Sequence, residues 1–481
     1  MGRSNGRPAP LFPNEAMTAR RRSAYWSPAQ AAASLVQLAY IERSLAHILA
    51  GWAVKMPAFD AKLAFGLQMH RAMERATSLR GRVNGLCYAT ASEAVVPAGL
   101  RCVLSHVDRA PTPARLVATI YRWLYPRIIA LCETHVRRAD PDGDRASIEL
   151  IRSLLPPMQQ ERRQGLSLSA RRAGLGPWFR ELEELWNARA GGEPLLLEDA
   201  TWRPLDRVPA AVRPEGSRFS PSGSLGLLPV DPVGEPRDIG MFLHKELDEE
   251  YTSLELVARN SYEHPDMPWA FHRDMLRQAS DEARHAVMIT RLMTARGFRH
   301  GDFTLTTSSY DGVYAFEPCA AGSRGELLWR MLIRQTFMEG LAIDNLAHEI
   351  GRRRSVGQAD IAMVFDYILR DEVFHAQSGL RWSRELIGND PQAVLAERAE
   401  AIGYFTARAE AARESFVMAN LDQAMSELAT IEAGKQSRGG QVPERPLNRT
   451  GRAQAGYSDE DILQVLSWGY ATDDSRTEGS V

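Results

Sequence analysis

The 481-residue sequence contains little cysteine and little lysine. Its four cysteines are Cys87, Cys102, Cys132 and Cys319. They form no CxxC pair and no Cys/His zinc spacing, which argues against a disulfide framework and against a zinc-finger type of site. Because lysine is scarce, arginine supplies nearly all of the positive charge. The net charge of −2 gives no electrostatic indication of nucleic acid or an anionic membrane as a partner.

Long apolar runs are also missing. No uninterrupted apolar stretch reaches transmembrane length, and the first residues lack the apolar segment of a secretory signal. Hydrophobic residues make up 44% of the chain and charged residues 25%, which is typical of a soluble protein with a substantial core. We therefore expect a cytoplasmic protein.

Composition divides the chain into five segments. A mobile N-terminal segment is expected over residues 1–26 and a helical domain over 27–189. Residues 190–239 are dense in proline and glycine and have no lasting period, which predicts a linker. Helical periodicity returns over 240–435, and a polar tail with one short helix follows over 436–481.

The predicted helices of residues 240–435 form two hairpins joined by a long crossover. This order is typical of a four-helix bundle with ferritin-like topology. The N-terminal half shows the same order, with its own crossover near residues 85–112, which indicates an internal duplication. The sequence thus predicts an all-α fold that contains a ferritin-like bundle and a second, degenerate copy of it.

Two copies of the pattern Asp-Glu-x-x-His occur ninety residues apart, as DEARH at 281–285 and DEVFH at 371–375. On a helix, a Glu and a His three residues apart face the same way, so one metal ion can take both. A single ExxH is expected about once by chance among eleven histidines, whereas two copies of DExxH are not. Each copy lies on the second helix of a predicted hairpin, as di-iron or di-manganese carboxylate bundles require.

Such a bundle needs one further Glu on its first helix and one on its third. Glu339 is the only acidic residue in the apolar stretch 327–343 of the third helix. On the first helix, Glu250 lies at the level of Glu282, and Glu255 is the alternative. The predicted metal ligands are therefore Glu250 (or Glu255), Glu282, His285, Glu339, Glu372 and His375.

This ligand set favours two iron ions, with manganese as the alternative, over zinc. A ligating histidine usually donates its other N–H to a carboxylate. Asp281 and Asp371 are each expected to do this for the histidine of the opposite motif, with Arg284 bridging an Asp. An ordinary surface pair between Asp281 and Arg284 is the alternative.

At these motifs the sequence resembles the ferritin-like di-iron carboxylate superfamily, because DEARH has the D-E-x-R-H form of bacterial multicomponent di-iron monooxygenases. The stretches YEHPDMPWAFHRDMLRQASDEARHAVM and RDEVFHAQSGLRW resemble a group of bacterial ferritin-like proteins related to the di-iron tRNA hydroxylase. The resemblance covers about residues 240–400. It implies the fold and the six ligands, but no substrate.

The N-terminal half departs from this pattern. Alignment on the C-terminal helices places Ala72 and Arg75 near the first Glu/His pair, and Gln159 and Arg162 near the second. Glu42 and Glu133 are the expected relics of the other two ligands. We expect a metal-free pseudo-domain in which arginine side chains occupy the interior and which supports the C-terminal bundle.

The sequence therefore predicts a non-haem di-iron oxidase or oxygenase that activates dioxygen to oxidise a small organic substrate. Candidates for an apolar substrate pocket are Tyr251, Phe337, Met338 and Phe374, together with the crossover 298–323. A ferroxidase or iron-handling protein, a hydroxylase of a modified nucleoside, and a metal-bound structural protein are the alternatives. The hypothesis leaves room for an external electron donor, such as a reductase or ferredoxin, and for a homodimer. It expects neither nucleic acid nor a membrane as a partner.

Overall fold

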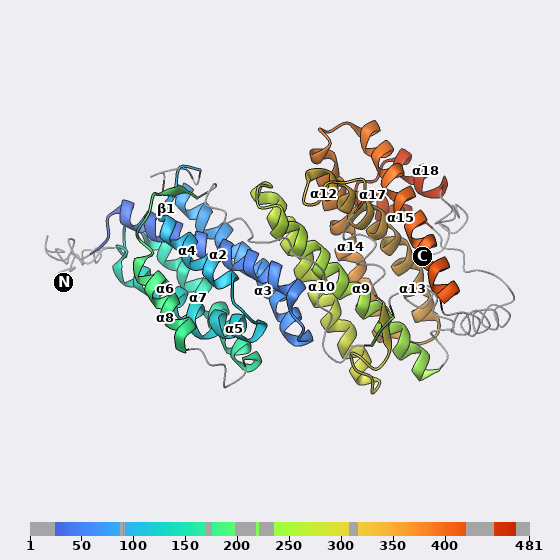
Figure 1. The fold of residues 1–481 in the computed structure, drawn as a ribbon, viewed down its shortest axis with the longest axis horizontal. Coiled ribbons are helices and arrows are strands. Elements are labelled where there is room, and N and C mark those ends of the chain that lie inside the picture. Colours follow the sequence, from blue (N-terminus) through green and yellow to red (C-terminus); the bar gives the residue numbers. More distant parts are fainter. Residues whose placement is uncertain are drawn as a thin grey trace, which may run out of the picture. The chain divides into compact units, whose positions relative to one another are not determined.

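The computed structural model describes residues 25–86, 90, 92–169, 176–197, 218–220, 235–306, 316–419 and 447–467. Helices dominate these residues (Figure 1). Their β structure is limited to two short pairings, one antiparallel between β1 (Val95–Val96) and β2 (Leu195–Leu196), and one parallel between β3 (Arg218–Ser220) and β4 (Thr304–Thr306). The predicted all-α class is therefore confirmed.

Contacts within the chain define two compact units. Unit 1 comprises Met1–Glu42, Arg75–Val107 and Ala114–Ala200, and unit 2 comprises Arg43–Glu74, Asp108–Pro113 and Thr201–Val481. The contacts thus group residues 43–74 with the C-terminal part of the chain. The five segments expected from composition follow other boundaries and stay predictions. Most of the expected mobile segment 1–26 and most of the expected linker 190–239 lie outside the described residues.

Eight helical elements begin in the N-terminal half of the described chain. They are α2 (Pro28–Lys55), α3 (Phe59–Gly85), α4 (Ala98–Asp108), α5 (Pro113–Ala118), η1 (Thr119–Leu124), α6 (Tyr125–Arg138), α7 (Arg145–Leu168) and α8 (Gly176–Ala188). The elements α5, η1 and α6 follow one another without a break, and η1 is a π-helix. Within unit 1, α6 and α7 pack against each other as antiparallel neighbours.

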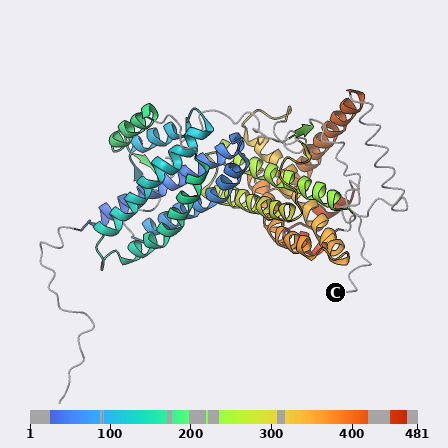
Figure 2. The ribbon, with the colours of Figure 1, turned by 90° about the horizontal axis from the view of Figure 1, so that it is seen from below.

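Unit 2 contains four long helical stretches. They are α9 (Pro236–Glu263), α10 (Trp269–Ala295), the unbroken run of α12 (Arg324–Arg330), η3 (Met331–Met338) and α13 (Glu339–Ser355), and α14 (Ala359–Leu386). Helix α9 packs along α10, α13 and η3 pack along α14, and α10 packs against α14 (Figures 1 and 2). The four stretches thus bury their facing side chains in one bundle core.

Short turns make α9 antiparallel to α10, and α13 antiparallel to α14. Pro268 stands at the N-cap of α10, where its missing N–H is not needed. Gly297 (φ 84°) follows the last turn of α10, and Gly357 (φ 78°) follows α13. Both adopt the left-handed conformation that glycine takes readily, and that conformation ends a helix within one residue.

The connection from α10 to α12 carries one short strand, β4, within the described residues. The remaining elements are α15 (Pro391–Ala419), α17 (Arg449–Gln454) and α18 (Asp459–Ser467). Arg452 attaches α17 to α13 through a buried ion pair with Asp344 (Nη2 to Oδ2, 2.6 Å). No helix within the described ranges has both the length and the apolar character needed to cross a lipid bilayer.

Candidate metal centre

All four helical stretches of unit 2 direct buried carboxylate or imidazole groups to one place in the core. Glu250 comes from α9, Glu282 and His285 from α10, Glu339 from the first turn of α13, and Glu372 and His375 from α14. The side chains form two groups: Glu250, Glu282, His285 and Glu372, and Glu282, Glu339, Glu372 and His375. Within each group the potential ligand atoms all lie within 4.8 Å of one another. Glu282 and Glu372 belong to both groups and are therefore the two carboxylates that the groups share.

Both histidines point their Nδ1 atoms into this cluster. His285 Nδ1 lies 3.0 Å from Glu250 Oε2, and His375 Nδ1 lies 3.1 Å from Glu372 Oε2. Neither imidazole is exposed, and no cluster residue is exposed by more than 9%. Ionised groups at such depth require a partner of opposite charge or a metal ion.

The outer nitrogen of each histidine faces the Asp of the opposite motif. His285 Nε2 lies 3.0 Å from Asp371 Oδ2, and His375 Nε2 lies 3.7 Å from Asp281 Oδ2. Arg284 contributes to both sides, because Nη2 donates to Asp281 Oδ1 at 3.1 Å and also to Asp371. The two motifs therefore interlock through their charged groups. An N–H held on Nε2 leaves the Nδ1 lone pair directed at the cluster.

The structure distinguishes between the two candidates of the first helix. Glu250 is in the cluster, whereas the fully buried Glu255 forms an ion pair with Lys62 of α3. Five residues correspond to a rotation of about 140° around a helix, so the two side chains cannot reach the same point. Only Glu250 is placed to bind a metal ion at this site.

Without a cation the cluster has to take up protons. Burial raises the pKa of Glu250 well above its usual value; His285 opposes this, and Glu282 and Glu372 reinforce it. Burial works against the charge of His285, yet Glu250 and Asp371 raise the pKa of this imidazole. Four carboxylates also match the charge of two divalent ions. The donor set and its charge thus fit two such ions, whose binding would displace the protons.

Sequence reasoning missed Gln278, which supports two of the carboxylates. Its Nε2 donates to Glu339 Oε1 at 2.9 Å and lies 3.2 Å from Glu282 Oε1. Gln278 precedes Glu282 by four residues and hence lies on the same face of α10, so this spacing could have identified it.

A π-helix precedes Glu339 directly. The segment η3 ends at Met338, and the hydroxyl of Tyr457 donates to the backbone carbonyl of Thr336 within it. Such segments are rare and often occur at functional sites, because the wider turn changes which residues face the core. Here it brings Arg334 and Glu339 to the same side of the helix, five residues apart, with Arg334 Nη2 3.6 Å from Glu339 Oε1.

A cavity of about 630 Å³ adjoins the cluster. Glu250, Glu339 and Glu372 line its inner end. Its wall combines apolar side chains, among them Phe242, Leu346 and Phe365, with charged ones, among them Lys245, Glu246, Glu349 and Arg352. The cavity is therefore more polar than the apolar pocket expected from the sequence.

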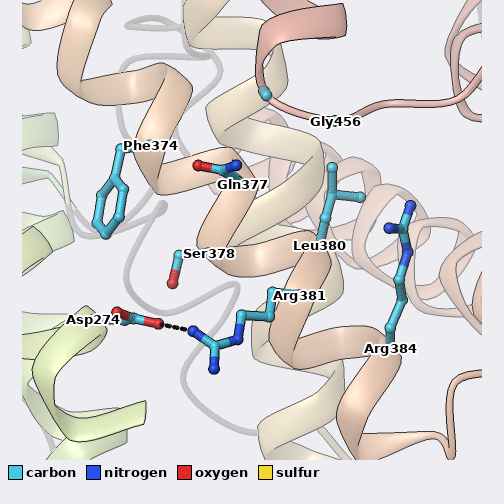
Figure 3. A pocket seen from close by; sticks show the side chains of 9 residues that line it. Asp274, Phe374, Gln377, Ser378, Leu380, Arg381, Arg384 and Gly456 are labelled. Carbon is cyan, nitrogen blue, oxygen red and sulfur yellow. Dashed lines mark hydrogen bonds and ion pairs between the residues drawn. The ribbon is translucent and has the colours of Figure 1, made fainter. Parts of the chain in front are cut away.

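Of the predicted pocket residues, Met338 lines this cavity, whereas Tyr251, Phe337 and Phe374 do not. Tyr251 and Phe337 are buried core residues, exposed by 0% and 4%. Phe374 lies under the guanidinium of Arg277 (3.6 Å to the ring centre). It lines a different cavity of about 420 Å³, between α14, Asp274 and Gly456 (Figure 3). The crossover 298–323 contributes no described residue to the cavity at the cluster.

Unit 1 contains a buried polar cluster of another kind. Arg75 of α3 donates through Nε to Glu42 of α2 and through Nη1 to Glu161 of α7, both at 2.9 Å. The hydroxyl of Tyr125 on α6 donates to the same oxygen of Glu161 at 2.8 Å. Four helices thus contribute one residue each, and a guanidinium supplies the central positive charge.

Glu42, Ala72 and Arg75 are buried as expected, whereas the interior positions expected for Glu133, Gln159 and Arg162 are wrong. Glu133 and Gln159 are exposed. Arg162 is half-buried and donates to the backbone carbonyl of Tyr121 at 3.3 Å. The groups able to hold a metal ion in the described part of the chain both lie in unit 2.

Fold and cluster together define a helical protein with a buried carboxylate–imidazole site that can hold metal ions. The chain belongs to the family described as "Protein of unknown function (DUF455)", whose model matches residues 213–463, just over half of the chain. All six cluster residues lie within the matched range.

One curated relative is an "Uncharacterized protein" of Haemophilus influenzae, which is 28% identical over 132 residues. The similar region covers 27% of this chain and 42% of the relative, so the chain spans less than half the length of that protein. No solved structure matches the chain.

Proposed function

We propose that this protein is a non-haem di-iron oxidase or oxygenase that uses dioxygen to oxidise a small organic substrate. The observation that carries the proposal is the cluster of Glu250, Glu282, His285, Glu339, Glu372 and His375, in which two carboxylates are shared between two groups of ligands. Two bound iron ions, with manganese as the alternative, would supply the redox chemistry that side chains lack. An external electron donor, such as a reductase or ferredoxin, is part of this proposal.

The chain's own residues would hold and shield these ions. Asp371 and Asp281 would keep the histidine protons on Nε2, so that both Nδ1 atoms remain available as ligands. Gln278 would orient Glu282 and Glu339. The buried position of every ligand would exclude bulk water, and the adjoining cavity would admit a substrate beside the cluster.

The proposal includes a ferritin-like bundle and an internal duplication. In its favour, both halves have the same order of helices, and the third stretch of each contains a π-helix, η1 in one and η3 in the other. Each half also gathers buried polar side chains from four helices, around Arg75 in the first and at the acidic cluster in the second. We propose that the guanidinium of Arg75 took the place of metal ions in a degenerate copy.

Iron handling without an organic substrate is the second candidate. Glu246, Glu249 and Glu349 line the cavity beyond the cluster, and such carboxylates would also suit a path for iron ions. The apolar walls formed by Phe242, Leu346 and Phe365 favour the organic substrate instead, because a path for ions does not require them.

Metal analysis tests the proposal. Full-length protein is loaded with iron(II) without oxygen, freed of excess metal, and analysed before and after exposure to dioxygen. We expect about two ions per chain and iron-dependent oxygen uptake. Glu339→Ala and His375→Ala should both lose iron. Glu349→Ala, on the same helix as Glu339 and lining the same cavity, should keep it. Wild-type protein that binds no iron would refute the site, and loaded protein that consumes no oxygen would refute the oxidase.

A further inference from the structure

Arg334 is a largely buried cation in the wall of the cavity at the cluster. It lies on η3, its side chain is 12% exposed, and it lines the cavity beside Glu339. Nη2 donates to Ser253 Oγ, whereas Nε has no hydrogen-bond partner among the described residues. A buried guanidinium N–H without a partner is rare, because its desolvation is not compensated.

The cluster carboxylates around Arg334 are balanced by protons in the metal-free protein and would be balanced by ions in the metal-bound one. Burial opposes the guanidinium charge, but Glu339, Glu282, Glu249 and Glu372 raise the pKa of Arg334. Three of these four carboxylates belong to the cluster. Two divalent ions would neutralise them and leave the half-buried Glu249 as the remaining carboxylate. A largely buried cation that is left with one nearby carboxylate as its counter-charge favours the binding of an anion.

We infer that Arg334 binds the carboxylate of the substrate, which makes the substrate a small carboxylic acid with an apolar body. This inference rests on the proposed function. The edge of a guanidinium matches a carboxylate, and the exposed part of the Arg334 side chain lies where this residue lines the cavity. One guanidinium suits a single negative charge better than a phosphate dianion. Phe242, Leu346 and Phe365 would contact the apolar body, and the volume of about 630 Å³ is typical of small-molecule sites.

Another role for Arg334 would be to hold Glu339 in place as a ligand. The two roles differ in what a substitution changes. A support for Glu339 affects the number of bound ions, whereas a substrate anchor affects carboxylate binding at constant metal content.

Butyrate binding to the iron(II)-loaded full-length protein tests the inference by calorimetry without oxygen, after the iron content has been measured. Uncharged butyramide is the matched ligand. We expect butyrate to bind and butyramide not to compete. Arg334→Gln should weaken butyrate binding about 10-fold or more while keeping two ions, as for the loss of a charge-assisted hydrogen bond. Arg334→Lys should bind butyrate with an affinity between those of Arg334→Gln and wild type.

Arg352→Gln is the control, because Arg352 lines the same cavity but is 27% exposed and pairs with Glu349. It should leave butyrate affinity within about twofold, as expected for a screened surface charge. Unchanged affinity in Arg334→Gln, loss of iron from this variant, or no butyrate binding to loaded wild type would each overturn the inference. If the iron analysis made before butyrate is added finds no iron in the wild-type protein, both the proposed function and this inference are refuted.

Discussion

Glu339→Gln should leave the free energy of unfolding of the metal-free protein almost unchanged, and it should lower that of the metal-bound protein. Burial raises the pKa of Glu339 well above its usual value; Arg334 opposes this, and Glu372 and Glu282 reinforce it. Burial therefore favours the neutral acid form of this side chain in the metal-free protein, and glutamine matches that form in shape and charge. The hydrogen bond from Gln278 Nε2 can be kept by the carbonyl oxygen of the new amide. We expect the free energy of unfolding to change by less than about 1 kcal/mol.

With metal present the same change removes a ligand. Glu339 belongs to one of the two ligand groups, so the variant should lose one ion. An ion at a free concentration of 100 times its dissociation constant stabilises the folded state by about 2.7 kcal/mol. For a domain of roughly 150–250 residues this corresponds to a melting temperature lower by about 5–10 °C than that of loaded wild type.

Thermal unfolding in the absence of oxygen, measured once with chelator and once with iron(II), gives the change in stability of the metal-free and of the metal-bound protein. The control is Glu246→Gln on α9, which lines the same cavity and pairs with the partly exposed Lys245 (3.6 Å), and which should melt like wild type under both conditions. An equal loss of stability with and without metal would contradict the reasoning, because it would show that Glu339 acts in packing and not as a ligand.

Two further predictions concern residues near the bundle. Burial and His300 lower the pKa of His244 to about 4, and His244 Nε2 accepts a hydrogen bond from the N–H of Gly301 (2.9 Å). As the pH falls, the unfolded chain therefore takes up this proton before the folded protein does. The free energy of unfolding should fall between about pH 6.5 and 4, by up to about 3 kcal/mol. His244→Asn should reduce this pH dependence in denaturant titrations. Glu255→Gln removes the charge that faces the buried Lys62 and should lower the free energy of unfolding by about 3–5 kcal/mol. The double variant with Lys62→Met should recover most of that loss, and the iron content should stay at two ions; a variant lacking iron would contradict our choice of Glu250.

The cluster could be predicted from sequence where the argument was local. The i, i+3 spacing of Glu282 and His285 fixes their common face once the segment is helical, and the same holds for Glu372 and His375. Glu339 followed from its isolated position in an apolar helix. The interlocking of Asp371 with His285 also followed, because two antiparallel hairpins bring the motifs together.

Residues that depend on distant contacts could not be predicted. Glu250 was favoured over Glu255 by its level on the first helix, but the ion pair of Glu255 with Lys62 could not be predicted, because the two residues lie 193 positions apart in the chain. The aromatic candidates Tyr251 and Phe337 were apolar and close to the cluster in sequence, but sequence does not show whether a side chain lines a cavity or fills the core. Arg334 received no role because the wider turn of η3 could not be recognised, and an ordinary helix would place it about 140° from Glu339.

Counting along helices also failed to identify the residues that face the interior of unit 1. Gln159 and Arg162 were placed by counting along α7, and the residue that turns inward is Glu161. On the third helix, Tyr125 takes the place expected for Glu133; it directly follows the π-helix η1, where counting by 3.6 residues no longer holds.

The ion pairs of Arg75 show that the interiors of the two units differ in the source of their positive charge. The positive charge in the interior of unit 1 is encoded in the chain and is present as soon as the chain is synthesised. The charge proposed for unit 2 has to be acquired from the surroundings. On the proposed function, the interior of unit 2 would hold protons until metal ions bind, whereas the interior of unit 1 needs no ion.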